Sequence, residues 1–348
     1  MSLLSSSSIT RGTASWVVLL AALGACIPLR ALAEAPALHG EFDTLFEPSG
    51  ITPLGDGTLL IVEDEPRRAV RLITFVGEGA ASPRVDERVL PPGDGLLSRL
   101  GLGALDDLEG VARDKADRVY VVGSHDDMGK RRRSDRQKLL RFSVENGGMV
   151  DVSLARDLAH DLVDAYPELR EAILEGKKRK REDLSIEGLA FDRRRGELLI
   201  GLRTPVLDDD AIIVRLVNPG AYVTGDAAAA FGARLTRLDL DKGGIRAMSY
   251  DDVSDRLLVV SRRESGGGGS FKLWQVSTTP DGDPDRLRLP DDVKSLADVE
   301  GLTTVDRRSG FLPGVLFVRD DGDPGKGRGG EWFAVTRASL GLPLQARR

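Results

Sequence analysis

Short apolar runs alternate with polar turns along most of the chain, and this pattern predicts many β-strands. Five of the runs end in charged residues: LLIVEDE (59–65), VYVVGSH (119–125), LLIGLR (198–203), LLVVSRR (257–263) and VLFVRDD (315–321). Shorter runs bounded by Gly, Pro or Asp predict further strands at 70–76, 139–144, 212–216, 235–240, 271–276 and 332–335.

A short motif precedes each of the five longer runs, so the chain contains an internal repeat. The clearest copies pair Glu with Gly: EGVA (109–112), EGLAFD (187–192) and EGLT (300–303). A fourth copy is SGIT (49–52), with Glu47 two residues earlier, and a fifth is RAMSYD (246–251), where Arg replaces Glu.

The spacing of the copies predicts the architecture. Successive copies lie 60, 78, 59 and 54 residues apart, which is longer than the roughly 40–50 residues of common propeller blades. Each interval therefore holds a hairpin and two further strands. We predict an all-β fold, a β-propeller of five to six blades in a single domain over 39–340. The alternative is a two-sheet β-sandwich in which the Glu-Gly pairs recur by chance.

The longest interval contains a helical pattern, LARDLAHDLVDAYPELREAIL (154–174), with apolar residues three and four positions apart. This pattern predicts a helical insertion in the propeller. Pro167 is expected to divide it, because a proline inside a helix removes a backbone donor and clashes with the preceding turn.

Residues 1–33 have the pattern of a secretory signal peptide. The run WVVLLAALGAC (16–26) is too short to span a bilayer, and Ala31-Leu32-Ala33 offers a small-residue cleavage site. LGAC (23–26) also resembles a lipobox, which would place cleavage before Cys26 and attach a lipid there. Both alternatives predict an exported protein, periplasmic or extracellular, with no transmembrane span in the mature chain.

Composition narrows the function classes. The formal charge of −6 argues against nucleic acid as a partner. One Cys excludes a disulfide framework and a Cys-based zinc site. GxSxG, HExxH and P-loop motifs are missing from the sequence, so common hydrolase and NTPase mechanisms lack their signatures. We expect a monomer that binds a small anionic ligand or a cell-surface partner.

In a propeller, a residue repeated at the start of the innermost strand forms a ring around the central channel. The repeat places Glu109, Glu187, Glu300, Arg246 and the Ser49/Glu47 pair in this ring. Counting sixteen residues onward gives a second set, Glu65, His125, Arg203 and Arg262, with Asp320 or Asp321 in the last copy. The two sets contain the candidate functional residues.

Converging carboxylates repel one another unless they are compensated. One compensation is Ca²⁺ or another divalent cation, for which Glu109, Glu187, Glu300, Glu65 and Asp321 are the candidate ligands. Another is pairing with arginines as salt bridges, which would serve ligand binding. The third alternative is structural: each Glu accepts backbone N–H bonds and fixes a turn.

The ordered motifs FEPSGI (46–51), VEDE (62–65), DDLEGVA (106–112), VGSHD (122–126), SIEGLAF (185–191), IGLRTP (200–205), GGIRAM (243–248) and DVEGL (298–302) resemble the bacterial family called domain of unknown function 3616. The resemblance covers about residues 40–322 and implies a propeller-like fold without an assigned activity. The Glu-Gly units are also remotely similar to those of esterase-like phytase domains and gluconolactonase-type propellers, in which such acids can hold a divalent cation.

These observations lead to two hypotheses. The first is a metal-assisted hydrolase of phosphoesters or other esters. In it the glutamates hold the cation, His125 assists proton transfer, and Arg203 and Arg246 bind the anionic group. The second is a non-catalytic ligand-binding or scaffold propeller. Pairwise neutralisation of the glutamates by Arg203 and Arg246 would weaken the first.

Overall fold

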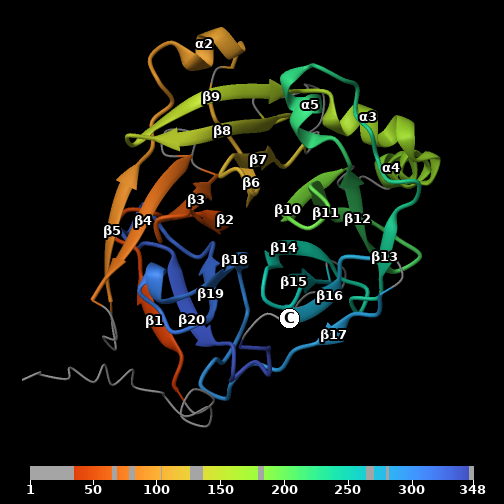
Figure 1. The fold of residues 1–348 in the computed structure, drawn as a ribbon. Helices are drawn as coiled ribbons and strands as arrows, with labels where there is room; N and C mark the ends of the chain where they lie inside the picture. The colour runs from red at the N-terminus through yellow and green to blue at the C-terminus, as the bar shows by residue number, and fades with distance from the viewer. Residues whose placement is uncertain are drawn as a thin grey trace, which may run out of the picture.

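The computed structural model describes residues 35–344, apart from 65–68, 78–82, 103, 126–135, 179–183, 264–269 and 280–281. Within these residues, twenty strands form five four-stranded antiparallel sheets, arranged around a centre like blades (Figure 1). The predicted all-β propeller is confirmed, with five blades, and the two-sheet sandwich is wrong. The expected signal segment, 1–33, and the candidate ligand Glu65 lie outside the described residues.

Each blade is named here after its innermost strand. The β2 blade contains β2 (Pro48–Pro53), β3 (Leu59–Glu63), β4 (Val70–Val76) and β5 (Arg84–Val89). The β6 blade contains β6 (Leu108–Arg113), β7 (Val119–Gly123), β8 (Leu139–Glu145) and β9 (Gly148–Ala155). The β10 blade contains β10 (Ser185–Asp192), β11 (Glu197–Leu207), β12 (Asp210–Leu216) and β13 (Thr236–Leu238). The β14 blade contains β14 (Gly244–Asp251), β15 (Arg256–Arg262), β16 (Lys272–Ser277) and β17 (Asp285–Arg286).

The β18 blade joins the two ends of the described chain. It contains β18 (Val299–Val305), β19 (Gly314–Arg319) and β20 (Glu331–Thr336), and its outermost strand is β1 (Leu38–Glu41). β1 pairs antiparallel with β20 over four residue pairs, from Leu38 opposite Ala334 to Glu41 opposite Glu331. This pairing closes the ring (Figure 1).

The apolar runs are continuous because each sheet is buried on both faces. Successive side chains of a strand point to opposite faces. In β3, Leu60 and Val62 pack against the β6 blade, whereas Leu59 and Ile61 pack against the β18 blade. Buried apolar clusters of this kind lie between all five pairs of neighbouring blades.

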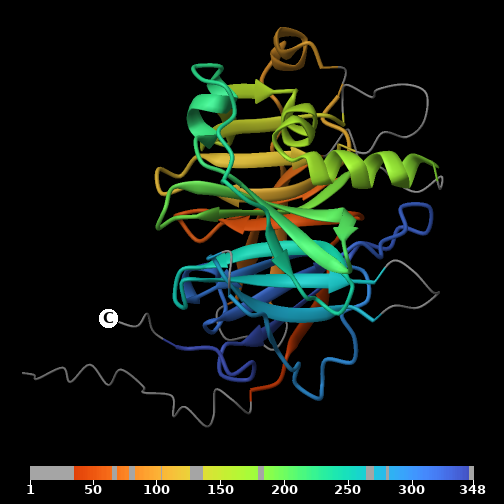
Figure 2. The same ribbon diagram turned by 90° about the vertical axis from the view of Figure 1, so that its right-hand side faces the viewer.

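The helical insertion is confirmed as α3 (Leu158–Ala165) and α4 (Pro167–Lys178), which are separated at Pro167 as expected. Leu154 and Ala155, predicted to be helical, instead end β9. The two helices bury Leu158, Leu162 and Leu169 against the β6 and β10 blades, and α4 lies beside β11 (Figure 2). The shorter helices are α2 (Leu96–Leu100), α5 (Pro219–Thr224) and the 3₁₀ turn η1 (Arg307–Ser309).

None of the helices in the described part of the chain is both long and apolar enough to cross a bilayer.

Candidate functional site

Each innermost strand carries a β-bulge at the ring position of the repeat. The pairing with the second strand of the blade skips one residue there, so two residues oppose one. The skipped residues are Ser49, Glu109, Glu187, Arg246 and Glu300. The repeat motif therefore encodes a bulge that directs one side chain per blade differently from its neighbours.

In four of the five blades a Gly follows the bulge residue and allows neighbouring innermost strands to approach closely, whereas Ala247 takes this place in the β14 blade. A Cβ atom on Gly188 would lie 2.7 Å from Cγ2 of Ile245 and 3.1 Å from the Cα atom of Gly201. On Gly301 it would lie 3.2 Å from the Cα atom of Gly50. The Glu-Gly pair thus combines a channel carboxylate with the small residue that lets the blades meet around it.

Two arginines lie between the glutamates of the ring. Arg203 Nη1 donates to Glu187 Oε1 at 2.8 Å, and Arg246 Nη1 donates to the same oxygen at 3.1 Å. Arg246 Nε lies 3.1 Å from Glu187 Oε2, and Arg246 Nη2 donates to Glu300 Oε1. Arg203, which lies sixteen residues after Glu187 and belongs to the second set, contacts Glu187 directly. Arg246 joins the β10 and β18 blades through carboxylates on both.

Glu109 faces this network without a cation of its own. Among the described residues its side chain has no hydrogen bond or ion pair, and it is partly exposed. Burial raises the pKa of Glu109 well above its usual value, and the charges of Glu187 and Glu300 raise it further. Burial also raises the pKa of Glu187 to about 8, although Arg246 and Arg203 counteract part of the rise.

The charge balance of the network adds to the effect of burial on these two pKa values. Three carboxyl groups face two guanidinium groups, so the network is neutral when it holds one proton or one added positive charge. Glu109 holds that proton most readily because, among the described residues, it is the carboxyl group of the three without a guanidinium partner.

A second layer of acids lies beside the ring at the same end of the channel. Burial and then the charge of Asp107 raise the pKa of Asp64 to about 6. Burial and then the charge of Glu300 raise the pKa of Asp320 to about 7. Arg136 Nη1 offsets part of this charge at 3.1 Å from Asp107 Oδ1. We call this end the acidic mouth, defined by Glu109, Glu187, Glu300, Asp64, Asp107 and Asp320.

The second layer contains one of the two acids that the repeat offered for the last copy and two acids that it did not select, Asp64 and Asp107. Asp320, not Asp321, is the acid within electrostatic reach of Glu300. Asp321 belongs instead to an outer hairpin, where its Oδ1 accepts the Glu331 N–H at 2.9 Å. Sequence signals for the other two were present: Asp64 directly follows an apolar strand, and Asp107 lies two residues before the Glu-Gly pair at 109–110.

His125 is buried beside Lys138 instead of joining the ring. Its Nε2 lies 3.3 Å from the Lys138 carbonyl oxygen, and Nδ1 has no hydrogen-bond partner within the described residues. Burial lowers the pKa of His125 to about 4, so the imidazole is neutral near pH 7. In the described structure no hydrogen bond or ion pair connects His125 with the three glutamates. Arg262, another member of the second set, packs over the Phe271 ring.

The arrangement does not favour a metal held by the three ring glutamates. In the described part of the chain, no group of three or more His, Cys, Asp or Glu side chains is arranged to hold an ion. The physical reason is that Arg246 lies between Glu187 and Glu300 and already hydrogen-bonds to both. A metal would have to displace a guanidinium to reach them.

No family model and no curated protein matches the chain, so the resemblance to domain of unknown function 3616 stays a prediction. Among solved structures, the chain is similar to hydrazine synthase of Kuenenia stuttgartiensis, with 11% identity, coverage of 81% and 79% of the two chains, and a TM-score of 0.40. It is also similar to a glucose dehydrogenase, with 12% identity, coverage of 85% and 98% of the two chains, and a TM-score of 0.42. A GH43 β-1,3-galactosidase with galactodeoxynojirimycin has 10% identity, coverage of 81% and 88% of the two chains, and a TM-score of 0.45. Similarities this distant carry no inference about function.

Proposed function

We propose that this protein is a ligand-binding propeller whose acidic mouth binds the ammonium group of a ligand. The observation that carries the proposal is Glu109, a carboxyl group with no hydrogen bond or ion pair among the described residues, beside a network with one carboxylate in excess. An ammonium group supplies one positive charge and up to three donors. It would replace the proton on Glu109 and leave the arginine pairs intact.

The same geometry argues against an anionic substrate at this end. Arg203 and Arg246, the expected anion-binding residues, hydrogen-bond to Glu187 and Glu300. A phosphoester entering here would meet the aspartates of the second layer and find both guanidiniums engaged. The acid-rich mouth would repel it, because like charges in a partly desolvated site interact strongly.

The metal-assisted hydrolase of phosphoesters or other esters is the second candidate. The raised pKa values of Asp64 and Asp320 favour it, because a divalent cation among the second-layer acids would replace protons. Asp64 and Glu109 would supply two of the oxygen ligands, and water would supply others, since no three acidic side chains of the described residues are arranged to hold an ion. The two candidates therefore differ in the cation and share Glu109.

The test is a thermal melt and a calorimetric titration of the full chain at constant ionic strength, with 1,4-diaminobutane, Ca²⁺, Mg²⁺ or Mn²⁺. A ligand that binds the native state raises the melting temperature, with a stabilisation of about 2.7 kcal/mol at a hundred times Kd. We expect the diamine to bind, and Glu109→Gln to abolish the effect. Glu171→Gln, a change at an exposed position of α4, is the control and should leave binding unchanged.

Stabilisation by a divalent ion alone would support the second candidate, and it would then need turnover of a phosphoester or a lactone that Glu109→Gln removes. A cooperative melt with no shift for any cation would refute both. We also propose that the protein acts outside the cytoplasm. Cell fractionation of the intact chain tests this, and Cys26→Ser releases the protein from membranes only under the lipobox alternative.

A further inference from the structure

A pocket lies at the end of the channel opposite the acidic mouth. Its cavity volume is about 30 Å³, and it is lined by residues at or just after the ends of the five innermost strands. Thr52, Ala112, Ala190, Ser249 and Thr303 each stand three residues after a bulge residue. The pocket is therefore built from all five blades, at the ends of the innermost strands opposite the acidic mouth.

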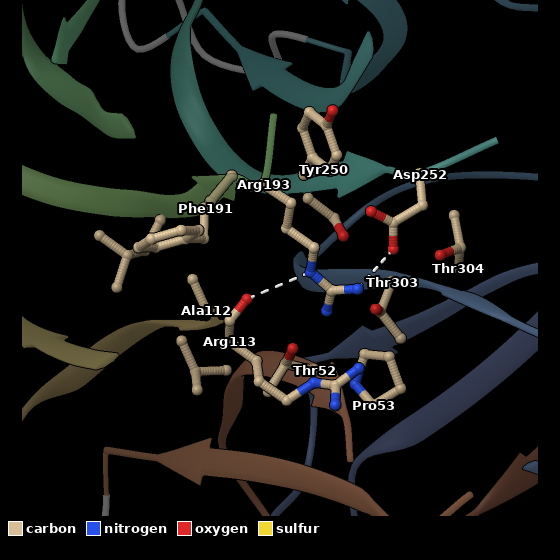
Figure 3. A pocket seen from close by; sticks show the side chains of 14 residues that line it. Thr52, Pro53, Ala112, Arg113, Phe191, Arg193, Tyr250, Asp252, Thr303 and Thr304 are labelled. Atoms are coloured by element: carbon tan, nitrogen blue, oxygen red, sulfur yellow. Dashed lines mark hydrogen bonds and ion pairs between the residues drawn. The ribbon is translucent and has the colours of Figure 1, made fainter. Parts of the chain in front are cut away.

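Two arginines dominate the charge of this pocket (Figure 3). Arg193 reaches across it, and its Nε donates to the Arg113 carbonyl oxygen at 3.4 Å. Their side chains are 22% and 11% exposed. Burial lowers the pKa of Arg113, and the nearby charge of Arg193 lowers it further. Each cation thus destabilises the other, and an anion between them would relieve both.

The internal carboxylates satisfy the arginines incompletely. Arg193 Nη1 donates to Asp252 Oδ2 at 2.6 Å, and Arg113 Nη1 donates to Asp117. These two aspartates are 52% and 68% exposed, so water weakens both pairs. The Nε atom of Arg113 is buried and has no hydrogen-bond partner among the described residues.

The remaining donors suit a carboxylate. Arg113 keeps Nε–H and Nη2–H on one edge of its guanidinium, which is the planar geometry that binds two carboxylate oxygens. Thr52, Thr303 and Thr304 line the same pocket, and their hydroxyl groups can donate to an anion. Figure 3 shows Thr303 between the two arginine side chains.

We propose that this arginine pocket, lined by Arg113, Arg193, Thr52, Thr303 and Thr304, binds a small molecule through its carboxylate. The anionic ligand expected from the sequence then binds at the end of the channel opposite Arg203 and Arg246. The proposal does not depend on the cation site, because the two groups of residues do not overlap.

The test is calorimetric titration of the full chain with malonate and, separately, inorganic phosphate, with chloride holding the ionic strength constant. We expect malonate to bind more tightly than phosphate. Arg113→Met should weaken malonate binding by about 10–100-fold, the equivalent of losing a charged hydrogen bond. Arg194→Met is the matched control, since Arg194 is 73% exposed and does not line the pocket.

Arg113→Lys keeps the charge but loses the planar edge, so it should also weaken malonate binding and serves if Arg113→Met does not fold. Glu109→Gln should leave malonate binding unchanged, which separates this result from the proposed function. Tighter binding of phosphate would overturn the carboxylate assignment. No binding of either anion, or equal binding by the wild type and both Arg113 variants, would overturn the site.

Discussion

Replacing Arg246 with Met should destabilise the propeller strongly, because it leaves two buried carboxyl groups without their shared cation. Arg246 is 7% exposed, and the Glu187 and Glu300 side chains that it contacts are 4% and 13% exposed. Breaking a buried ion pair by removing one partner costs about 3–5 kcal/mol. A Coulomb estimate for one pair at about 4 Å and an effective dielectric constant near 20 gives about 4 kcal/mol.

The loss should depend on pH in a defined direction. The Arg246 charge lowers the pKa of Glu187, so its removal raises that pKa further above about 8. A carboxyl group whose folded pKa is raised is harmless below its unfolded pKa of about 4.5, and it costs stability as the pH rises toward the folded value. Both proteins keep Glu187 protonated below about pH 8, so the part of the loss that is linked to Glu187 should be small there and should grow as the pH rises above about 8.

The assay is urea denaturation of the wild type and the variant at pH 5 and pH 9.5, since urea does not screen charges. A loss of 3–5 kcal/mol corresponds to roughly 6–10 °C in melting temperature for a domain of this size. Arg194→Met removes an exposed pair, in which Arg194 Nη1 lies 2.6 Å from Asp255 Oδ2, and should cost at most about 1 kcal/mol. A loss below 1 kcal/mol at pH 9.5, or an equal loss at both pH values, would refute the reasoning.

Three further predictions concern the packing and the buried groups. Gly188→Val should destabilise by about 1–3 kcal/mol through overpacking, because a Cβ atom there lies 2.7 Å from Ile245 Cγ2; in the same urea assay Gly148→Ala, with its nearest atom at 3.7 Å, should cost little. The pKa of His125 is lowered to about 4 in the folded protein, so the unfolded state takes up the proton first and the wild type should lose stability as the pH falls from about 6.5 to about 4. His125→Gln should remove this loss, and identical pH profiles of the two proteins would contradict the prediction. Arg337→Met should cost about 3–5 kcal/mol in chemical denaturation, since Arg337 donates to both Asp251 carboxylate oxygens at 2.8 and 2.7 Å in a pair that is nearly fully buried; a loss within experimental error would show that this pair is dispensable.

Much of the fold was predictable because the repeat combines several independent signals. The apolar runs gave the second strands, and the Glu-Gly motif gave the start of each innermost strand. Pro167 gave the division of the helical insertion. The weakest predictions were outer strands such as β13, predicted as 235–240 and found at Thr236–Leu238, because an edge strand is defined by partners that a local pattern does not show.

The candidate site was only partly predictable. Repeat register placed Arg203 opposite Glu187, since both lie on one hairpin. It could not decide between Asp320 and Asp321, because a shift of one residue along a strand moves a side chain to the other face. Nor did it reveal Arg113 and Arg193, which follow the bulge positions by four and six residues and meet across blades.

The pairing of β1 with β20 has a consequence for how the molecule is made. Four residue pairs join segments at opposite ends of the described chain, so the circle stays open until residues beyond 330 are present. Until then the growing polypeptide is an arc whose two terminal blades each expose an apolar flank. On the β2 blade, Ile51 and Leu59 remain uncovered until Val305, Leu316 and Trp332 pack against them. The arginine pocket is assembled from all five blades and the acidic mouth from four of them, including the first and the last, so neither is complete in the arc. Ligand binding at the acidic mouth or the arginine pocket would therefore show that the first and the last blade have packed together.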